Sequence, residues 1–163
     1  MIIISDTGPL ISLSLIDQLG LLEKIYTQFY IPEKVWEEVK PHLLNQNRFT
    51  DLHFLQQHVK KITRPILSNA IELEFIDEGE AESIVLLREM HADALLIDDM
   101  AGTLYAEKMG IACFGVLRVL IEAKKLLLIG NLRPYLIIFL EHKRFFSKKV
   151  FNDVLLEMNE PPL

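Results

Sequence analysis

Acidic side chains follow two apolar segments of the chain at the point where each segment ends. Asp6 comes directly after residues 2–5, and Asp98 and Asp99 come directly after residues 94–97. Both segments are continuously apolar, which is typical of strands that are buried on both faces of a parallel sheet. The carboxyl ends of parallel strands meet at one edge, where open α/β sheets bind their ligands. We therefore expect these carboxylates to lie close together.

Two more pairs of acids lie in stretches that predict helices next to strands. Glu37 and Glu38 belong to the helix after the strand expected at 29–31, and Glu80 and Glu82 begin the helix before the strand at 94–97. Like charges about 4 Å apart repel by roughly 4 kcal/mol per pair at an effective dielectric constant of about 20. Protonation or a bound cation relieves this repulsion. Carboxylate ligands favour Mg²⁺ or Mn²⁺, which activate water for attack on a phosphodiester.

Each of these acids also has a purely structural interpretation. Asp6 and Asp98 precede helices, where aspartate is a favoured N-cap. Acids in the first turn of a helix, such as Glu80 and Glu82, interact favourably with the helix dipole. For one residue alone the structural interpretation is at least as good, and only the joint pattern of acids after two strands and in two helices favours a site.

An alternation of strands and helices positions these acids. We expect strands at residues 2–5, 29–31, 59–62, 94–97 and 111–114, and helices at 10–19, 21–26, 33–39, 48–58, 80–90, 101–109 and 116–127. This order predicts an α/β fold, a three-layer α/β/α sandwich around a central, mostly parallel sheet of four or five strands. The helix that begins at residue 33 is expected to end before Pro41.

Residues 131–163 predict a C-terminal helical appendix beyond an α/β domain at 1–130. Its helices are expected at 134–146 and 147–158, with Ser147 as the N-cap of the second. We expect this extension to pack on the same domain or on a partner, because its apolar residues exceed what one small helix needs. These residues are Leu136, Ile137, Phe139, Leu140, Phe145 and Phe146.

The appendix also contains the densest basic stretch of the chain. A solvated helix end is the simpler interpretation, and contacts with an RNA backbone are the functional alternative. The residues that would make these contacts are Lys143, Arg144, Lys148 and Lys149.

Composition narrows the class of protein further. A length of 163 residues predicts one domain with a sizeable core. The net charge of −6 argues against a protein that coats nucleic acid through a general basic surface. The single cysteine, Cys113, excludes an internal disulfide and a Cys-rich zinc site, which favours the reducing cytoplasm. The apolar stretches at 1–16 and 126–140 contain interrupting polar residues, so we expect no membrane segment.

Four blocks of the sequence resemble the motifs of PIN-domain nucleases. Ile2–Leu10 is similar to the opening of that family, Ile31–Val39 to its second acidic block, and Gly79–Ile84 and Leu95–Asp99 to its third and fourth. The ordered set covers most of residues 1–130. Its nearest resemblance is to a prokaryotic subfamily related to VapC-type toxins.

The resemblance implies a set of catalytic and metal-binding acids with nearby alternatives. The matching acids are Asp6, Glu38, Glu80 and Asp98; the alternatives are Glu37, Glu82 and Asp99; Thr7 is a supporting hydroxyl. The family implies a Mg²⁺- or Mn²⁺-dependent endoribonuclease that cleaves single-stranded or structured RNA. A metal-activated water attacks phosphorus and leaves a 5′-phosphate.

The same resemblance implies partners and leaves alternatives open. Expected partners are an RNA substrate, a cognate antitoxin for a toxin component, and a second copy of the chain in a homodimer. Two departures weaken the substrate assignment, because Thr103 stands where relatives commonly have Arg and Ile97 where many have Thr. The main alternative is a non-catalytic PIN-like module that binds RNA or protein. Receiver and phosphatase patterns fit less well, since Gly115 and Gly8 replace a required lysine and acid.

Overall fold

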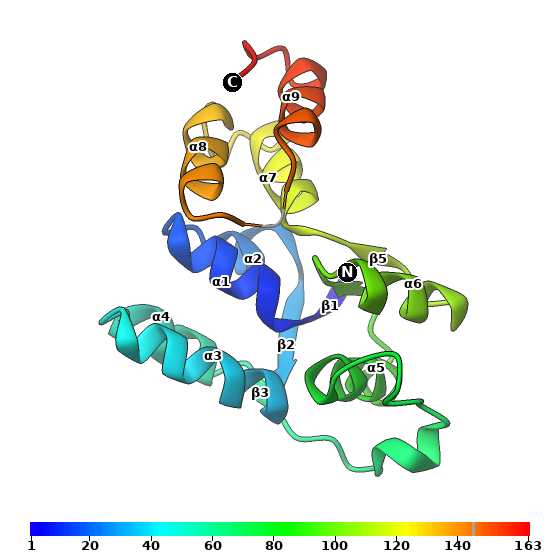
Figure 1. Ribbon diagram of the computed structural model, residues 1–163. Coiled ribbons are helices and arrows are strands. Elements are labelled where there is room, and N and C mark those ends of the chain that lie inside the picture. Colours follow the sequence, from blue (N-terminus) through cyan, green and yellow to red (C-terminus); the bar gives the residue numbers. More distant parts are fainter. Residues whose placement is uncertain (145) are drawn as a thin grey trace.

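The computed structural model describes residues 1–144 and 146–163 and is built around a parallel sheet (Figure 1). In the described residues the sheet has five strands in the order β3-β2-β1-β4-β5. Each neighbouring pair is parallel. The strands are β1 (Ile2–Ser5), β2 (Gln28–Pro32), β3 (Val59–Lys60), β4 (Ala94–Leu96) and β5 (Cys113–Phe114). The predicted α/β fold with a mostly parallel sheet is confirmed.

Strand β1 lies at the centre of the sheet, between β2 and β4. The backbone N–H of Asp6 donates to the carbonyl oxygen of Leu96, the last residue of β4, at 2.9 Å, which extends the β1–β4 ladder one residue past the end of β1. The chain therefore leaves β1 and β4 at the same edge of the sheet. Asp6 and Asp98 are brought to that edge by backbone pairing alone.

Helices cover both faces of the sheet, as the three-layer prediction requires. Successive residues of β1 belong to different hydrophobic cores. Ile3 packs in the core that contains residues of α1, α2 and α7, and Ile4 in the core that contains residues of α5 and α6. The helices are α1 (Thr7–Leu15), α2 (Leu21–Ile25), α3 (Glu33–Asn45), α4 (Phe49–Gln56), α5 (Glu78–Met90), α6 (Met100–Lys108), α7 (Val116–Lys125), α8 (Arg133–Glu141), α9 (Lys148–Glu157) and the 3₁₀ helix Ile66–Asn69.

Helix α3 does not end before Pro41, so that prediction is wrong. It runs to Asn45 with Pro41 inside it. Pro41 is exposed, and the carbonyl that loses its hydrogen-bond donor can be hydrated. Val39 and Leu43, one turn apart, are both fully buried. Burying a leucine contributes roughly 1.5–3 kcal/mol, comparable with the roughly 3 kcal/mol cost of an internal proline.

Helix α8 ends at Glu141 rather than at Phe146, and this correction matters for the site. Lys143 adopts a left-handed conformation with φ of 51°, and the N–H of Arg144 donates to the carbonyl of Phe139 at 2.9 Å. This turn ends the helix and sends the following residues back toward α1. Phe145, which we assigned to the helix, lies outside the described residues. The predicted Ser147 N-cap is confirmed, because its hydroxyl accepts the N–H of Val150.

The two C-terminal helices pack on the rest of the chain. Leu136, Phe139 and Phe151 belong to the same buried core as residues of α1 and α7. Glu160 fixes this arrangement, because its buried carboxylate accepts the N–H groups of Leu132 and Arg133, at 2.6 and 2.9 Å, where α8 begins. Its third partner is the ammonium group of Lys124 on α7 at 2.5 Å. Across residues 1–144 and 146–163, no helix combines the length and apolarity needed to cross a membrane.

Candidate active site

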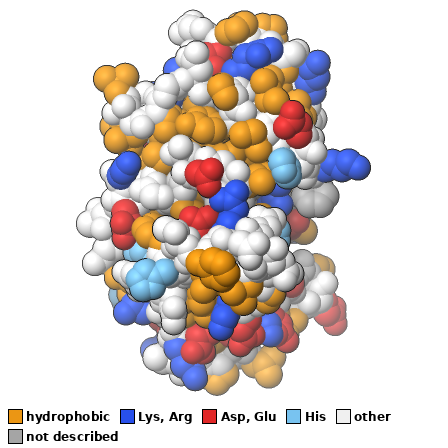
Figure 2. All heavy atoms as spheres, turned by 90° about the vertical axis from the view of Figure 1, so that its left-hand side faces the viewer, with side chains coloured by type: hydrophobic (Ala, Val, Ile, Leu, Met, Phe, Trp, Pro, Cys, Tyr) orange, Lys and Arg blue, Asp and Glu red, His pale blue; other side chains and the backbone are white. Residues whose placement is uncertain are grey.

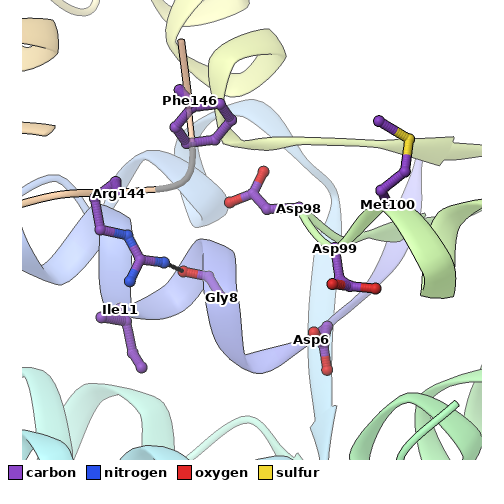
Figure 3. Close-up of a pocket in the computed structure, with 8 residues that line it drawn as sticks. All are labelled: Asp6, Gly8, Ile11, Asp98, Asp99, Met100, Arg144 and Phe146. Atoms are coloured by element: carbon purple, nitrogen blue, oxygen red, sulfur yellow. Dashed lines mark hydrogen bonds between the residues drawn. The ribbon is translucent and has the colours of Figure 1, made fainter. Parts of the chain in front are cut away.

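The carboxyl edge of β1 and β4 opens into a pocket of about 480 Å³ (Figure 3). Asp6 enters it from the start of α1 and is 8% exposed. Asp98 enters it from the loop between β4 and α6. The described residues that line the pocket are Asp6, Gly8, Ile11, Asp98, Asp99, Met100, Arg144 and Phe146. The structure therefore brings together the acids that follow the two strands.

Glu38 reaches the same edge from α3. Its Oε2 atom accepts the hydroxyl of Thr7 at 2.5 Å, which holds the carboxylate next to Asp6. The other oxygen faces α5, since a Cβ atom added to Gly79 would lie 2.8 Å from Glu38 Oε1. A side chain at position 79 would therefore displace the Glu38 carboxylate from its present position.

Glu80 combines a structural and a site-facing role. It forms a capping box with Asp77, in which Glu80 N–H donates to the Asp77 carboxylate at 2.8 Å and Glu80 Oε2 accepts Asp77 N–H at 3.1 Å. The other oxygen lies against α6, because a Cβ atom on Gly102 would stand 2.4 Å from Glu80 Oε1. The capping interpretation is thus correct for Glu80 Oε2, whereas Oε1 takes no part in the capping box.

Asp98 has one oxygen held by the protein and one that is not. Its Oδ1 accepts the N–H of Val116 at 2.8 Å, at the start of α7, and a Cβ atom on Gly115 would lie 2.6 Å from that oxygen. Its Oδ2 is buried and has no hydrogen-bond partner among the described residues. Buried polar atoms are nearly always paired, so this oxygen is an acceptor that lacks its donor or cation.

Three of the four acids thus lie against a glycine at the beginning of a helix. The pairs are Glu38 with Gly79, Glu80 with Gly102, and Asp98 with Gly115. None of these glycines was among the predicted site residues. Within a helix, glycine costs about 1 kcal/mol relative to alanine, so Gly79 and Gly102, which lie inside α5 and α6, indicate a spatial need, whereas Gly115 is the N-cap of α7.

Burial and mutual repulsion raise the pKa values of these carboxyls. The pKa of Asp6 rises from 3.8 to about 7, chiefly because the group is buried, with added repulsion from Glu80, Asp77 and Glu38. The pKa of Glu80 rises to about 7, again chiefly through burial, with repulsion from Asp77 and Asp99. These charges interact although they come from different elements. Asp77 belongs to this cluster and was not among the predicted site residues.

The other two predicted acids shift in the same direction. Burial raises the pKa of Asp98 to about 6, against the opposing effects of the Val116 N–H and the Arg144 cation. The pKa of Glu38 is also raised, because its carboxyl end is partly shielded from water although the side chain as a whole is exposed. At neutral pH part of this cluster is therefore protonated in the absence of a cation.

The alternative acids have different surroundings. Glu82 accepts the backbone N–H of Lys34 at 3.0 Å and so caps α3. Glu37 is exposed and pairs with the Lys34 ammonium at 3.4 Å. Asp99 is the N-cap of α6, where it accepts the N–H of Gly102 at 2.8 Å, and it also lines the pocket. Of the three alternatives, Asp99 alone lines the pocket with Asp6 and Asp98.

The four basic residues of the appendix that were predicted to contact RNA also differ in whether they line the pocket. Lys143 and Lys148 are exposed, and Lys149 pairs with Asp153 at 2.7 Å within α9. Arg144 instead lines the pocket. On the face of the molecule in Figure 2, acidic and basic side chains are interspersed with apolar ones, and no continuous basic surface is visible there. Arg144 is thus a local cation at an acidic site.

The donor chemistry fits a hard divalent cation, although the carboxylates are not arranged as a coordination sphere. Among the described residues, no three His, Cys, Asp or Glu side chains converge closely enough to hold a metal ion as they stand. Protein donors hold the oxygens apart, namely the Thr7 hydroxyl and the N–H groups of Asp77 and Val116. Oxygen ligands of raised pKa and the unpaired Asp98 Oδ2 suit Mg²⁺ or Mn²⁺, and coordination would require these side chains to move together.

A family model described as a PIN domain matches residues 2–160. The chain belongs to the PIN-domain family. PIN domains are typically nucleases, so membership indicates a nuclease-type function in general terms. The match continues past residue 130, the end of the region that the resemblance covers, through α8 and α9 to Glu160. A search of curated proteins gives no match. The resemblance to PIN-domain nucleases is confirmed, and the relation of this PIN domain to VapC-type toxins stays a prediction.

Proposed function

We propose that this PIN domain is an endoribonuclease that depends on Mg²⁺ or Mn²⁺ and hydrolyses phosphodiester bonds. Asp6, Glu38, Glu80 and Asp98 are its proposed metal-binding and catalytic acids. The observation that carries the proposal is the buried Asp98 Oδ2, which has no hydrogen-bond partner among the described residues and shares a pocket with Asp6. An anionic oxygen in that position gains most from a cation, because the described residues supply no donor to it.

The residues of the chain would prepare the site in distinct ways. The Thr7 hydroxyl orients Glu38, and the backbone N–H groups of Asp77 and Val116 orient Glu80 and Asp98. When bound, a divalent cation lowers the pKa of a water molecule and offsets phosphodiester charge. Since the acids have raised pKa values, they would release protons as the cation binds.

RNA as the substrate, and a toxin role in the cytoplasm, are also part of the proposal. They are supported by the resemblance of the four motif blocks to the toxin-related subfamily. A cognate antitoxin and a second copy of the chain are the partners that we propose. RNA cleavage can be tested separately from the antitoxin and the homodimer, because the nuclease assay requires neither of these protein partners.

The test is cleavage of labelled single-stranded RNA by the full chain, with Mg²⁺ or Mn²⁺ and with EDTA. We expect cleavage that EDTA abolishes and that Asp6→Asn and Asp98→Asn each reduce about a hundredfold or more. Asp153→Asn is the matched control, because that side chain is 62% exposed on α9. Products should carry a 5′-phosphate, and a parallel single-stranded DNA substrate tests the choice of RNA. Intact RNA with both metals, or full activity of Asp6→Asn, would refute the nuclease.

The non-catalytic alternative is a second candidate, favoured by the lack of a preassembled set of three metal ligands among the described residues. It predicts that the chain retains RNA without a divalent cation. It also predicts that Asp6→Asn leaves this binding unchanged. A gel-shift measurement in EDTA on the same proteins distinguishes the two functions.

A further inference from the structure

The pocket beside the carboxylates contains a cation that comes from the far end of the sequence. Arg144 follows α8, and its guanidinium donates from Nε to Ser12 Oγ at 3.0 Å and from Nη2 to the carbonyl of Gly8 at 3.1 Å. Both acceptors lie on α1, one turn apart. Among the described residues that line the pocket, Arg144 is the one with a positive charge. The folded chain therefore fixes a guanidinium at the rim of an acidic site.

The charge of Arg144 lowers the pKa of Asp98, but no hydrogen bond joins the two side chains among the described residues. Figure 3 shows the Arg144 guanidinium hydrogen-bonded to Gly8 rather than to the Asp98 carboxylate, and no ion pair joins the two side chains among the described residues. These two hydrogen bonds to α1 use two of the five N–H groups of the guanidinium. The remaining donors match a phosphate, which arginine binds through parallel hydrogen bonds. A guanidinium with unused donors and a carboxylate oxygen without a partner among the described residues thus line one pocket, where the first suits a phosphate and the second a metal.

The remaining wall of the pocket is apolar. Ile11, Met100 and Phe146 line it together with the charged groups. Met100 is 73% exposed at the start of α6, so fold stability does not explain its size. The volume of about 480 Å³ lies within the roughly 300–1,000 Å³ of small-molecule pockets. An aromatic ring and a thioether are suitable contacts for the face of a nucleobase.

We propose that this pocket is a subsite for one unpaired nucleotide next to the scissile phosphodiester. Arg144 binds the phosphate of that nucleotide, and Met100, Phe146 and Ile11 contact its base. The inference rests on the proposed nuclease function and specifies which part of the substrate is held. A base stacked and paired within a duplex does not present its faces, so the subsite selects single-stranded RNA over helical RNA.

The test is titration of the full chain with 5′-AMP and with ribose 5-phosphate in the presence of Mg²⁺, followed by NMR. We expect Arg144→Gln to weaken binding of both probes about tenfold, because both carry the phosphate. Met100→Ala should weaken 5′-AMP alone, about threefold, because ribose 5-phosphate has no base. Lys24→Gln and Leu104→Ala are matched controls, since both side chains are exposed and do not line the pocket. Both should bind like the unaltered protein.

A merely structural role of Arg144 would give different results. Arg144→Lys keeps the charge but loses the planar fork, so it should weaken ribose 5-phosphate binding less than Arg144→Gln does. Ser12→Ala removes a partner that holds the guanidinium but not the cation, and should also retain binding. Equal losses in Arg144→Lys, Ser12→Ala and Arg144→Gln, or a loss of both probes in Met100→Ala, would overturn the subsite. So would the absence of binding to the unaltered protein.

The subsite and the nuclease can fail separately. If RNA stays intact but Arg144→Gln weakens ribose 5-phosphate binding, the nuclease proposal falls, and phosphate binding by Arg144 stands without it. If RNA is cleaved and Arg144→Gln leaves KM unchanged, the subsite falls alone. If both hold, Arg144→Gln raises KM for single-stranded RNA about tenfold and changes kcat less.

Discussion

Raising the pH from about 5 to about 8 in EDTA should destabilise the protein. Asp6 has a pKa of about 7 in the folded chain and an ordinary value of 3.8. Between these values the folded state binds more protons than the unfolded state, so the free energy of unfolding decreases as pH rises. The contribution is fully present below the ordinary pKa and is lost as pH passes through 7. Glu80 and Asp98 act in the same direction, with pKa values of about 7 and about 6.

The loss of unfolding free energy can be worked out first for Asp6 alone. One pKa unit corresponds to about 1.36 kcal/mol, so the loss from Asp6 alone between about pH 5 and about pH 8 is roughly 3 kcal/mol. The three acids do not add in full, because each is raised partly by the charge of its neighbours. We therefore expect a total of about 3 kcal/mol or somewhat more. For a chain of this size that lowers Tm by roughly 6–12 °C.

The assay is thermal unfolding in EDTA at several pH values for the unaltered protein, Asp6→Asn and Asp153→Asn. Asp6→Asn should lose much of the pH dependence, and Asp153→Asn should keep it. His42 has a lowered pKa, which acts in the opposite direction as pH rises, but it is common to all three proteins. The difference between them therefore isolates the carboxyl. A Tm that is constant or rises with pH in the unaltered protein would refute the account, as would an unchanged slope in Asp6→Asn.

Two further substitutions test how the chain holds its carboxylates. Gly115→Ala should displace the Asp98 carboxylate, since the new Cβ would lie 2.6 Å from Oδ1, and should remove most RNA cleavage. Gly20→Ala is the control and should keep RNA cleavage, because nothing lies within 4 Å of a Cβ added there. Full cleavage by Gly115→Ala would show that the position of this carboxylate is not required. Glu160→Gln should lower the free energy of unfolding in urea by about 2–4 kcal/mol, because it breaks a buried ion pair. Glu157→Gln, whose side chain is 58% exposed, should change it by less than about 1 kcal/mol, and equal effects of the two would contradict the role of Glu160.

Much of the sheet and of the acid positions could be predicted because those signals are local. A continuous β-branched run at 2–5 predicts a buried parallel strand, and the residue that follows such a strand lies at its carboxyl edge. Asp6 and Asp98 therefore reach one pocket by a rule that needs no long-range information. The pairing of β1 with β4 also limits the distance between Asp6 and Asp98, and this pairing cannot be read from the sequence alone.

The parts that could not be predicted depend on contacts between distant segments. The end of α8 depends on a left-handed Lys143 and on acceptors for Arg144 on α1, 132 and 136 residues away. The proline within α3 is tolerated because Leu43 is buried by other elements. Glu160 gives no signal in the sequence, since its partners are backbone groups at the start of α8. In each case tertiary packing outweighs the local preference of the chain.

Calorimetric titration of Mn²⁺ into the full chain near neutral pH tests the central claim most directly. We predict saturable binding with release of protons, detected as a dependence of the heat on the ionisation enthalpy of the buffer, because the bound carboxyls have raised pKa values. Asp98→Asn should abolish this binding, and Asp153→Asn should preserve it. The absence of saturable binding to the unaltered protein, or equal binding by Asp98→Asn, would contradict a metal-binding carboxylate site.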